Sequence, residues 1–250
     1  MAPLACTLAL LAMATATTAV NVIPLDMAPD SFDDQYQGCD PAMMEALPAL
    51  NRSEFEQNKK FAEVWVKAAA KWQSRGPPES PLSPDQATAI MAFTMDGMSS
   101  MFNEAVSTAG RSREEYRDNF HFKTLHFLLT TALALVTLRQ AQYGQCHRLF
   151  WGVHDVHFQA WQGQRVRFGQ FILMSLHKEI ALEFGADTIF EVHTSHGVDI
   201  HQFSLFPREE EVLIPPFETF KVTKVTRNGQ KAWISLRSAG TFSKYNCAWL

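Results

Sequence analysis

The sequence predicts an α+β domain in which a mostly helical first half packs on a mostly antiparallel β second half. Up to about residue 145, apolar residues recur at spacings of three and four, which is typical of amphipathic helices. After Gly144 the apolar runs are short, aromatic and β-branched, which is typical of strands. A chain of 250 residues that is 46% hydrophobic can fill a sizeable core. Helices followed by strands favour the α+β class, with one domain over residues 21–250.

The helical half is expected to cover about residues 21–145. One helix is predicted to begin at Ser53, a favourable N-cap residue, because apolar side chains follow it at helical spacing. A Pro-rich loop over 75–84 ends this helix, and Ser83 is predicted to begin the next one. The apolar run 124–138 is shorter than the ~20 residues of a membrane-spanning helix, so we expect a buried helix there.

The sheet half is expected to cover about residues 146–250. A single helix, ending at Gly185, is predicted to interrupt its strands. The strands are predicted in the segments "CHRLFWGV", "RVRFGQFILMS", "TIFEVHTS", "EVLIPPFETFKVTKV" and "KAWISLRSA".

Charge and the chain termini indicate an extracellular protein. The formal net charge of −4 gives no reason to expect nucleic acid or an anionic membrane as a partner. Residues 1–20 contain a short apolar stretch followed by small residues, which is typical of a secretory signal peptide. Asn51 begins a glycosylation sequon, and the ending "KYNCAWL" has no hydrophobic tail of the kind a lipid anchor needs. We therefore expect a secreted monomer without a membrane span.

Three consecutive glutamates, Glu209, Glu210 and Glu211, form the most distinctive polar cluster. On a strand, Glu209 and Glu211 would share one face about 7 Å apart, with Glu210 on the other face. Such a pair suits chemistry at a sugar carbon, where one carboxylate stabilises an oxocarbenium-like centre and the other handles a proton. Spacing alone leaves a second interpretation open, in which the cluster is a solvated acidic turn.

The stretch "EEEVLIPPFETFKV" resembles the signature of the vertebrate mono-ADP-ribosyltransferases that modify arginine, an ecto-enzyme family related to certain bacterial toxins. Further stretches resemble landmarks of the family in the same order, from about residue 22 to the end: "PLDMAPDSFDDQYQGC", "AGRSREEY", "FKTLHFLLTTAL", "CHRLFWGVHDVHF", "RFGQF" and "YNC". The resemblance implies a fold that encloses an NAD cleft. It also implies transfer of ADP-ribose from NAD, or NADP, to arginine side chains of acceptor proteins, with release of nicotinamide.

Carried onto this chain, the resemblance implies roles for several residues. Glu211 is similar to the catalytic glutamate, which holds the nicotinamide ribose, and Glu209 to the glutamate that engages the acceptor guanidinium. Ser204 and Phe93 stand where the family has NAD-contacting residues, with Phe93 at a position that is usually tyrosine. A strand hydroxyl and a core aromatic remain equally good interpretations of these two. Gln170 receives a cofactor-binding role only from its place in the resemblance.

The chain departs from the family pattern at two positions of the expected NAD site. Trp151, before Gly152, stands where the family has the arginine that binds the NAD pyrophosphate. Leu173 stands where the family has its first functional serine, although Ser175 matches the second. Two functions therefore remain open: an arginine-specific transferase, or a catalytically impaired member that binds NAD or a protein partner. Arg148 is expected to point away from Trp151, because three residues separate them on a strand.

The resemblance also implies a disulfide between Cys39 and Cys247. The usual partner of Cys146 is replaced by Ser195, so Cys146 is expected to be unpaired.

Two weaker patterns receive structural interpretations. The histidines, among them His154 and His157, lack a recognised ligand spacing, and we expect no metal. Arg165 and Arg167 alternate on one predicted strand face, where a solvated face is favoured over a phosphate contact.

Overall fold

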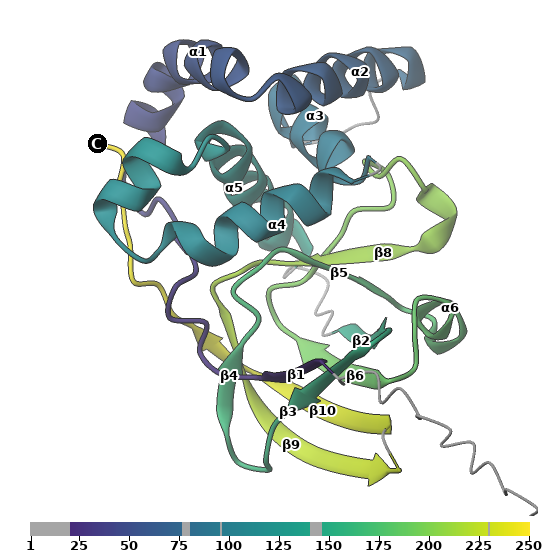
Figure 1. The fold of residues 1–250 in the computed structure, drawn as a ribbon. Coiled ribbons are helices and arrows are strands. Elements are labelled where there is room, and N and C mark those ends of the chain that lie inside the picture. Colours follow the sequence, from purple (N-terminus) through teal and green to yellow (C-terminus); the bar gives the residue numbers. More distant parts are fainter. Residues whose placement is uncertain (1–20, 77–80, 96, 141–146, 230) are drawn as a thin grey trace, which may run out of the picture.

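The computed structural model describes residues 21–76, 81–95, 97–140, 147–229 and 231–250. Figure 1 shows the helical half lying over the sheet half. The predicted signal peptide at 1–20 and Cys146 lie outside the described residues.

The helices are α1 (Asp40–Gln57), α2 (Lys59–Arg75), α3 (Pro84–Phe93), α4 (Met98–Ala109), the π-helical turn η1 (Glu115–Asn119), α5 (Lys123–Gln140), α6 (Lys178–Glu183) and the 3₁₀ turn η3 (Pro207–Glu209). The strands are β1 (Asn21–Pro24), β2 (His147–Val153), β3 (Val156–Gln159), β4 (Arg165–Arg167), β5 (Ile172–Ser175), β6 (Thr188–Thr194), β7 (Val198–Asp199), β8 (Glu211–Ile214), β9 (Glu218–Asn228) and β10 (Lys231–Thr241).

The helix starts were predicted in part. Ser83 caps α3 as expected, and it forms a reciprocal capping box with Gln86. Ser53 was predicted wrongly, because α1 already runs through it to Gln57. The next helix begins after Asn58, whose side chain accepts a hydrogen bond from the Phe61 amide at 3.0 Å. An Asn cap thus supplies the helix start that the sequence suggested five residues earlier.

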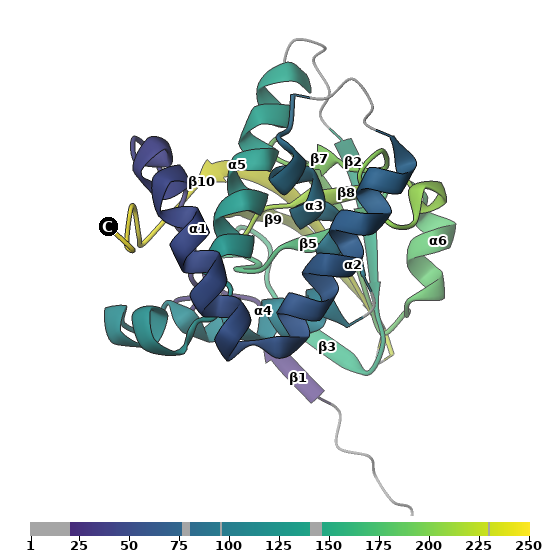
Figure 2. The ribbon, with the colours of Figure 1, turned by 90° about the horizontal axis from the view of Figure 1, so that it is seen from above.

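Helix α5 lies at the centre of the helical half, as Figure 2 shows from above. Most of its described side chains between Lys123 and Val136 are buried, in agreement with the predicted core helix. Within the described ranges, no helix is long and apolar enough to cross a membrane. Glu54 from α1 accepts hydrogen bonds from the Lys123 and Thr124 amides, so a buried carboxylate satisfies the start of α5.

The glycosylation sequon lies inside a helix rather than in a loop. Asn51 is in the last part of α1 and is half-buried, and its side-chain oxygen is enclosed without a hydrogen bond among the described residues. Its glycosylation stays a prediction.

In the described part of the chain, eight strands form one sheet in the order β4-β9-β10-β6-β2-β5-β8-β7. All neighbours are antiparallel except β10 and β6, so the predicted mostly antiparallel sheet is confirmed. Two expected strands are each divided in two. The run 165–175 breaks between β4 and β5 at Gly169, which has a φ of +67° and no space for a Cβ atom beside Ala28 and Ser31. The run 211–225 breaks between β8 and β9 around Pro215, since proline cannot donate to a ladder.

The sheet is almost divided between β2 and β5. Among the described residues, a single pair, Phe150 and Ser175, joins these strands, whereas β2 pairs with β6 along seven residues. Buried apolar side chains form one core that joins the helices to β5 and β8, and a second core within the sheet half. The functional cleft described below lies at this weak junction.

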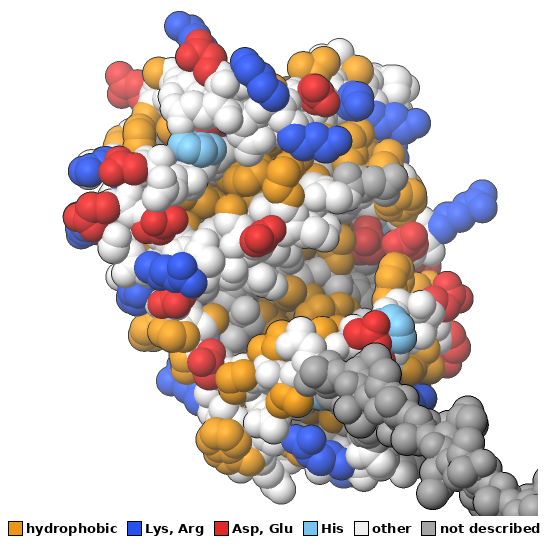
Figure 3. Space-filling model, in the orientation of Figure 1, with side chains coloured by type: hydrophobic (Ala, Val, Ile, Leu, Met, Phe, Trp, Pro, Cys, Tyr) orange, Lys and Arg blue, Asp and Glu red, His pale blue; other side chains and the backbone are white. Residues whose placement is uncertain are grey.

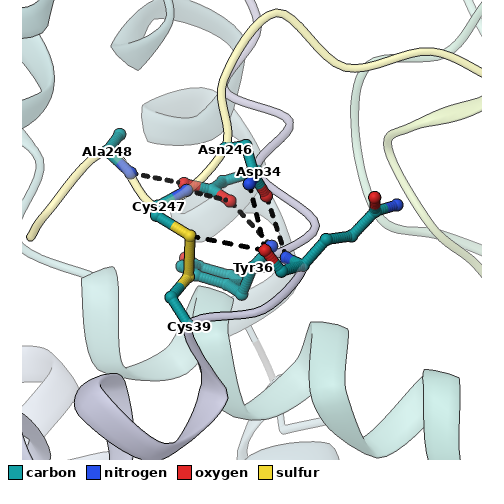
Figure 4. Close-up of a disulfide and its surroundings, with 7 residues drawn as sticks. Asp34, Tyr36, Cys39, Asn246, Cys247 and Ala248 are labelled. Carbon is teal, nitrogen blue, oxygen red and sulfur yellow. Dashed lines mark hydrogen bonds between the residues drawn. A yellow bond between two sulfur atoms is a disulfide. The ribbon is translucent and has the colours of Figure 1, made fainter.

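A disulfide ties the C-terminal segment to the start of α1. Cys39 and Cys247 are bonded, with their Cα atoms 6.0 Å apart, which confirms the predicted pairing. Figure 4 shows Asp34 beside this bond, where its carboxylate accepts hydrogen bonds from the amides of Tyr36, Cys247 and Ala248. These bonds fix the segment that the disulfide crosses.

Candidate active site

A cleft of about 900 Å³ opens between the helical half and the sheet half. Figure 3 shows apolar side chains gathered along the hollow between the helices above and the sheet below. Helices α3 and α4 form one wall, and strands β2, β5 and β8 with helix α6 form the other. The predicted site residues that line it are Phe93, Trp151, Gln170, Leu173, Ser175, Glu209 and Glu211.

Glu211 is the first residue of β8 and is only 8% exposed. The pKa of its carboxyl group is raised, chiefly because burial disfavours the charged form and also because Glu209 lies nearby. One carboxylate oxygen, Oε2, accepts a hydrogen bond from the Ser204 hydroxyl at 2.5 Å. A buried carboxylate with one fixed oxygen is therefore presented to the cleft.

The expected strand alternation across the three glutamates was wrong. Glu209 ends the 3₁₀ turn η3, Glu210 has a positive φ of 46°, and the strand begins only at Glu211. A tight turn, rather than two strand steps, brings Glu209 and Glu211 to the same cleft. Glu210 points elsewhere and pairs with His177 at 2.8 Å on the surface. The solvated-turn interpretation thus fits Glu210, and not its neighbours.

Trp151 occupies the expected arginine position as part of an aromatic cluster. Its indole stacks on Phe190 with ring centroids 5.3 Å apart, and it also contacts Phe158 and Phe168. Arg148 instead pairs with Glu191 at 2.8 Å and is not among the described residues that line the cleft. The expectation that Arg148 points away from Trp151 agrees with these contacts.

Gly152 has a packing role rather than a place in the cleft lining. A Cβ atom at this position would lie 2.2 Å from the carbonyl oxygens of Ala181 and Gly185. Strand β2 and helix α6 therefore approach so closely that only glycine fits between them.

Leu173 and Ser175 face the cleft from β5. Leu173 pairs with Leu213 and packs against the helical core, while Ser175 pairs with Glu211 across β5 and β8. The Ser175 hydroxyl accepts from the His177 amide at 3.0 Å and lies 3.5 Å from the Glu209 carbonyl. Ser175 therefore supports the turn that carries Glu209.

Gln170 and Phe93 are held from the helical wall of the cleft. The Gln170 side-chain Nε2 donates to the backbone carbonyl of Asn103 at 3.2 Å. Phe93 is fully buried, with its ring against Phe102 and Phe171, so its side chain contributes to the core as well as to the cleft wall.

Asn103, on α4, was missed by sequence reasoning. Its side chain accepts from the Phe171 amide at 3.0 Å and donates to the Phe171 carbonyl at 2.8 Å. This pair of bonds fixes the entry of β5 to the helical wall. No local signal could have identified it, because the partners lie 68 positions apart.

Two predicted contacts lie outside the cleft. Ser204 is completely buried behind Glu211 and is not among the described residues that line the cleft. Arg167, considered as a phosphate ligand or a solvated residue, is 1% exposed and forms a salt bridge with Asp33. It also donates to the carbonyls of Met27 and Ala28, so its charge is already neutralised and its donors are used.

The charges of the cleft are all acidic among the described residues that line it. Glu104, Glu209 and Glu211 contribute carboxylates, and no Lys, Arg or His occurs in the described lining. A pyrophosphate bound here would lack the charge-assisted hydrogen bonds that usually hold such a group.

One histidine lies beside two carboxylates, although the histidines show no recognised ligand spacing in the sequence. The ligand atoms of His154, Asp155 and Asp187 lie within 4.8 Å of one another. His154 and Asp155 lie at the turn between β2 and β3, and Asp187 lies directly before β6. His154 bonds Asp187 at 3.0 Å, and none of the three is among the described residues that line the cleft. These contacts account for the proximity of the three side chains as local structure.

Comparison with known proteins gives consistent matches over most of the chain. A sequence model of the family described as "NAD:arginine ADP-ribosyltransferase" matches residues 25–244. The chain is 51% identical to erythroblast NAD(P)(+)–arginine ADP-ribosyltransferase of Gallus gallus, over 91% of this chain and 76% of the relative. It is 45% identical to GPI-linked NAD(P)(+)–arginine ADP-ribosyltransferase 1 of Homo sapiens, over 91% of this chain and 75% of the relative.

A solved structure shares the fold. A mutant of the eukaryotic mono-ADP-ribosyltransferase ART2.2 in complex with NAD superposes with a TM-score of 0.78 and 34% identity, covering 91% of this chain and all of that one. The matches in sequence and in fold span both halves that form the cleft. The chain therefore belongs to the NAD:arginine ADP-ribosyltransferase family.

Proposed function

We propose that this protein transfers ADP-ribose from NAD, or NADP, to arginine side chains of acceptor proteins and releases nicotinamide. The observation that carries the proposal is the buried Glu211 beside Glu209 in a cleft between the two halves of the domain. The family supplies the donor and acceptor chemistry, since relatives are named for NAD(P) and arginine. NAD is consumed as a substrate in this proposal.

Glu211 would act on the donor. As the bond between the ribose C1′ and the nicotinamide nitrogen breaks, nicotinamide leaves with the electron pair and positive charge develops on the ribose. A carboxylate in a partly dry site stabilises this charge better than water does, because no solvent reorganisation is needed. The oxygen that does not bind Ser204 is free to accept a hydrogen bond from a ribose hydroxyl.

Glu209 would act on the acceptor. A guanidinium remains protonated near neutral pH and is a poor nucleophile. A carboxylate at the cleft edge can hold it by charge-assisted hydrogen bonds and accept the proton that its nitrogen loses on bonding to C1′. The turn from Pro207 to Glu210 places this carboxylate close to Glu211.

A second candidate function is supported by Trp151 and Leu173. They leave the described cleft lining without a cation and without a serine hydroxyl at position 173. In this alternative the chain keeps the fold and binds NAD or a protein partner, but catalyses transfer poorly.

The two functions are separated by turnover and by NAD binding. The purified protein is incubated with labelled NAD and agmatine, with a Glu211→Gln variant as the control. Labelled agmatine formed well above the control supports the transferase, whereas no difference contradicts it. In that case, a melting temperature that rises with NAD favours an NAD-binding protein, and one that does not change favours a protein-interaction role.

We also propose an extracellular location. The Cys39–Cys247 disulfide suits an oxidising compartment, and a human relative is named as GPI-linked. Expression of the full chain in animal cells, followed by assay of medium and cell surface, tests this location. Protein retained in the cytosol would contradict it.

A further inference from the structure

The catalytic glutamate proposed above needs a group that fixes its carboxylate, and Leu173 cannot provide one. We infer that Ser204 positions Glu211 for the proposed reaction. The inference rests on the proposed function, and it assigns Ser204 a role different from the NAD contact expected from the sequence.

The Ser204 hydroxyl donates its hydrogen to the carboxylate of Glu211. It accepts a hydrogen bond from the Phe206 amide at 3.0 Å, and it lies 2.5 Å from Glu211 Oε2. Because the amide occupies an acceptor position, the hydroxyl hydrogen is directed to the carboxylate. Within the described residues, Glu211 Oε1 forms no hydrogen bond, which leaves that oxygen for a ligand in the cleft.

Backbone hydrogen bonds connect the segment around Ser204 to Glu211. The Ile200 amide donates to the Glu211 carbonyl at 3.0 Å, and the Ser204 amide donates to the Ile200 carbonyl at 2.8 Å. The segment 200–211 therefore forms a loop whose base contains the hydroxyl, the carboxylate and three hydrogen bonds. Glu209 lies on the same loop, so the bond between Ser204 and Glu211 also fixes the base of the acceptor-binding turn.

The helical half holds this loop from outside. Arg75, at the end of α2, donates to the Ser204 carbonyl at 2.8 Å, and the Thr94 hydroxyl accepts from the Leu205 amide at 2.9 Å. The rings of Trp72 and Phe203 lie 5.7 Å apart. Ser204 is thus anchored to the wall of the cleft opposite the β-strands, and its position does not depend on β5, which carries Leu173.

Ser204 can be tested against a matched serine elsewhere in the chain. Ser238 donates to Glu218 Oε1 at 2.6 Å, so it also forms a hydroxyl-to-carboxylate bond with a buried glutamate. Neither residue of that pair is among the described residues that line the cleft. A Ser238→Ala variant therefore controls for the loss of such a bond without touching the proposed machinery.

The experiment measures kinetics with NAD and agmatine together with the titration of Glu211 by carbon-13 NMR of labelled carboxyl groups. In Ser204→Ala, kcat is expected to fall about 100-fold, as for a small displacement of a reacting group, with KM for NAD changed less than about threefold. In this variant the acid limb of the plot of kcat against pH should move to higher pH, and the pKa of Glu211 should rise. The reason is that the Ser204 hydroxyl stabilises the ionised carboxylate in the wild type. Ser204→Thr, which keeps the hydroxyl, should recover most of the activity, and Ser238→Ala should leave both readouts unchanged.

Melting curves of each variant show that it is folded, which separates positioning from collapse of the loop. A Ser204→Ala variant with unchanged kcat, or with an unchanged pKa of Glu211, would overturn the inference. The titration does not require turnover. An inactive wild-type protein would therefore contradict the proposed function, while the pKa comparison would still decide whether Ser204 fixes Glu211.

Discussion

Arg167 and Asp33 form a completely buried salt bridge, although 134 positions separate them in the sequence. It joins β4 to the segment that precedes α1, and Asp33 also accepts from the amides of Lys244 and Tyr245. A buried charge that loses its partner is costly, because neither water nor another ion replaces it.

Replacing the arginine is therefore expected to destabilise the fold strongly. Arg167→Met should lower the free energy of unfolding by about 3–5 kcal/mol, measured by urea denaturation. Arg165→Met, at the exposed first position of the same strand, is the control and should cost less than about 1 kcal/mol. Equal losses in the two variants would contradict a structural role specific to Arg167.

The disulfide between Cys39 and Cys247 is expected to contribute about as much to the free energy of unfolding as the buried salt bridge does. Its closure spans a sequence separation of 208 residues, for which the chain-entropy estimate is about 5 kcal/mol. A Cys39→Ser/Cys247→Ser variant should melt at a clearly lower temperature than the wild type. Addition of reductant should lower the melting temperature of the wild type and leave that of the variant unchanged.

His126 is expected to make stability depend on pH. It is fully buried with Nδ1 2.9 Å from the Tyr36 hydroxyl, and burial lowers its pKa from 6.5 to about 3. Between these values the unfolded chain takes up a proton and the folded chain does not. The contribution of His126 to the free energy of unfolding is therefore fully present above pH 6.5. It is lost as the pH falls towards 3, by roughly 5 kcal/mol at about 1.4 kcal/mol for each pKa unit.

The contribution of His126 can be isolated by comparing variants. The His126→Phe protein should show a weaker loss of unfolding free energy between pH 6.5 and 3 than the wild type. Identical slopes in wild type and His126→Phe would contradict the assignment.

Restoring the expected pyrophosphate contact should increase activity with NAD. The Trp151→Arg/Leu173→Ser variant should raise kcat/KM at least tenfold, since a charge-assisted hydrogen bond contributes about 1.5–3 kcal/mol. The gain contributed by Trp151→Arg alone should be absent with nicotinamide riboside, which has no pyrophosphate. The Trp151→Arg/Leu173→Ser variant should melt at a lower temperature than the wild type, because it loses the packing of Trp151 on Phe190. An equal gain with both donors would show that the arginine acts in another way.

Glu209 is expected to control the acceptor rather than the donor. Glu209→Gln should reduce transfer to agmatine about 10- to 100-fold, because the neutral amide cannot take the proton from the guanidinium. Hydrolysis of NAD by water should change much less, so the ratio of free ADP-ribose to labelled agmatine should rise. Parallel loss of both products would place Glu209 in the donor step.

Local features of the sequence predicted local features of the structure. The helix start at Ser83 and the buried helix over 124–138 depend on neighbouring residues, and both were predicted. The motif around Glu211 also predicted the family. Features that depend on distant contacts were not predictable, as Arg167 shows: its partner Asp33 is a tertiary neighbour and leaves no pattern in the sequence around β4.

The acidic cluster shows a further limit. Three identical residues contain no signal that distinguishes a strand from a turn. Strand alternation fails here because Glu210 is in the left-handed region of backbone conformation. The hydrogen bond between Ser204 and Glu211 was also not predictable. The two residues are seven positions apart, and they meet only because the chain turns between them.

The bond between Cys39 and Cys247 makes 209 residues of the chain a covalent ring. A protease that cuts this ring once converts it into a linear chain but releases no fragment. Without reductant, such a nicked molecule would keep its full mass on a denaturing gel, and both walls of the cleft would stay tethered to each other. A single proteolytic cut inside this ring therefore breaks the backbone at one point and leaves one covalently connected molecule.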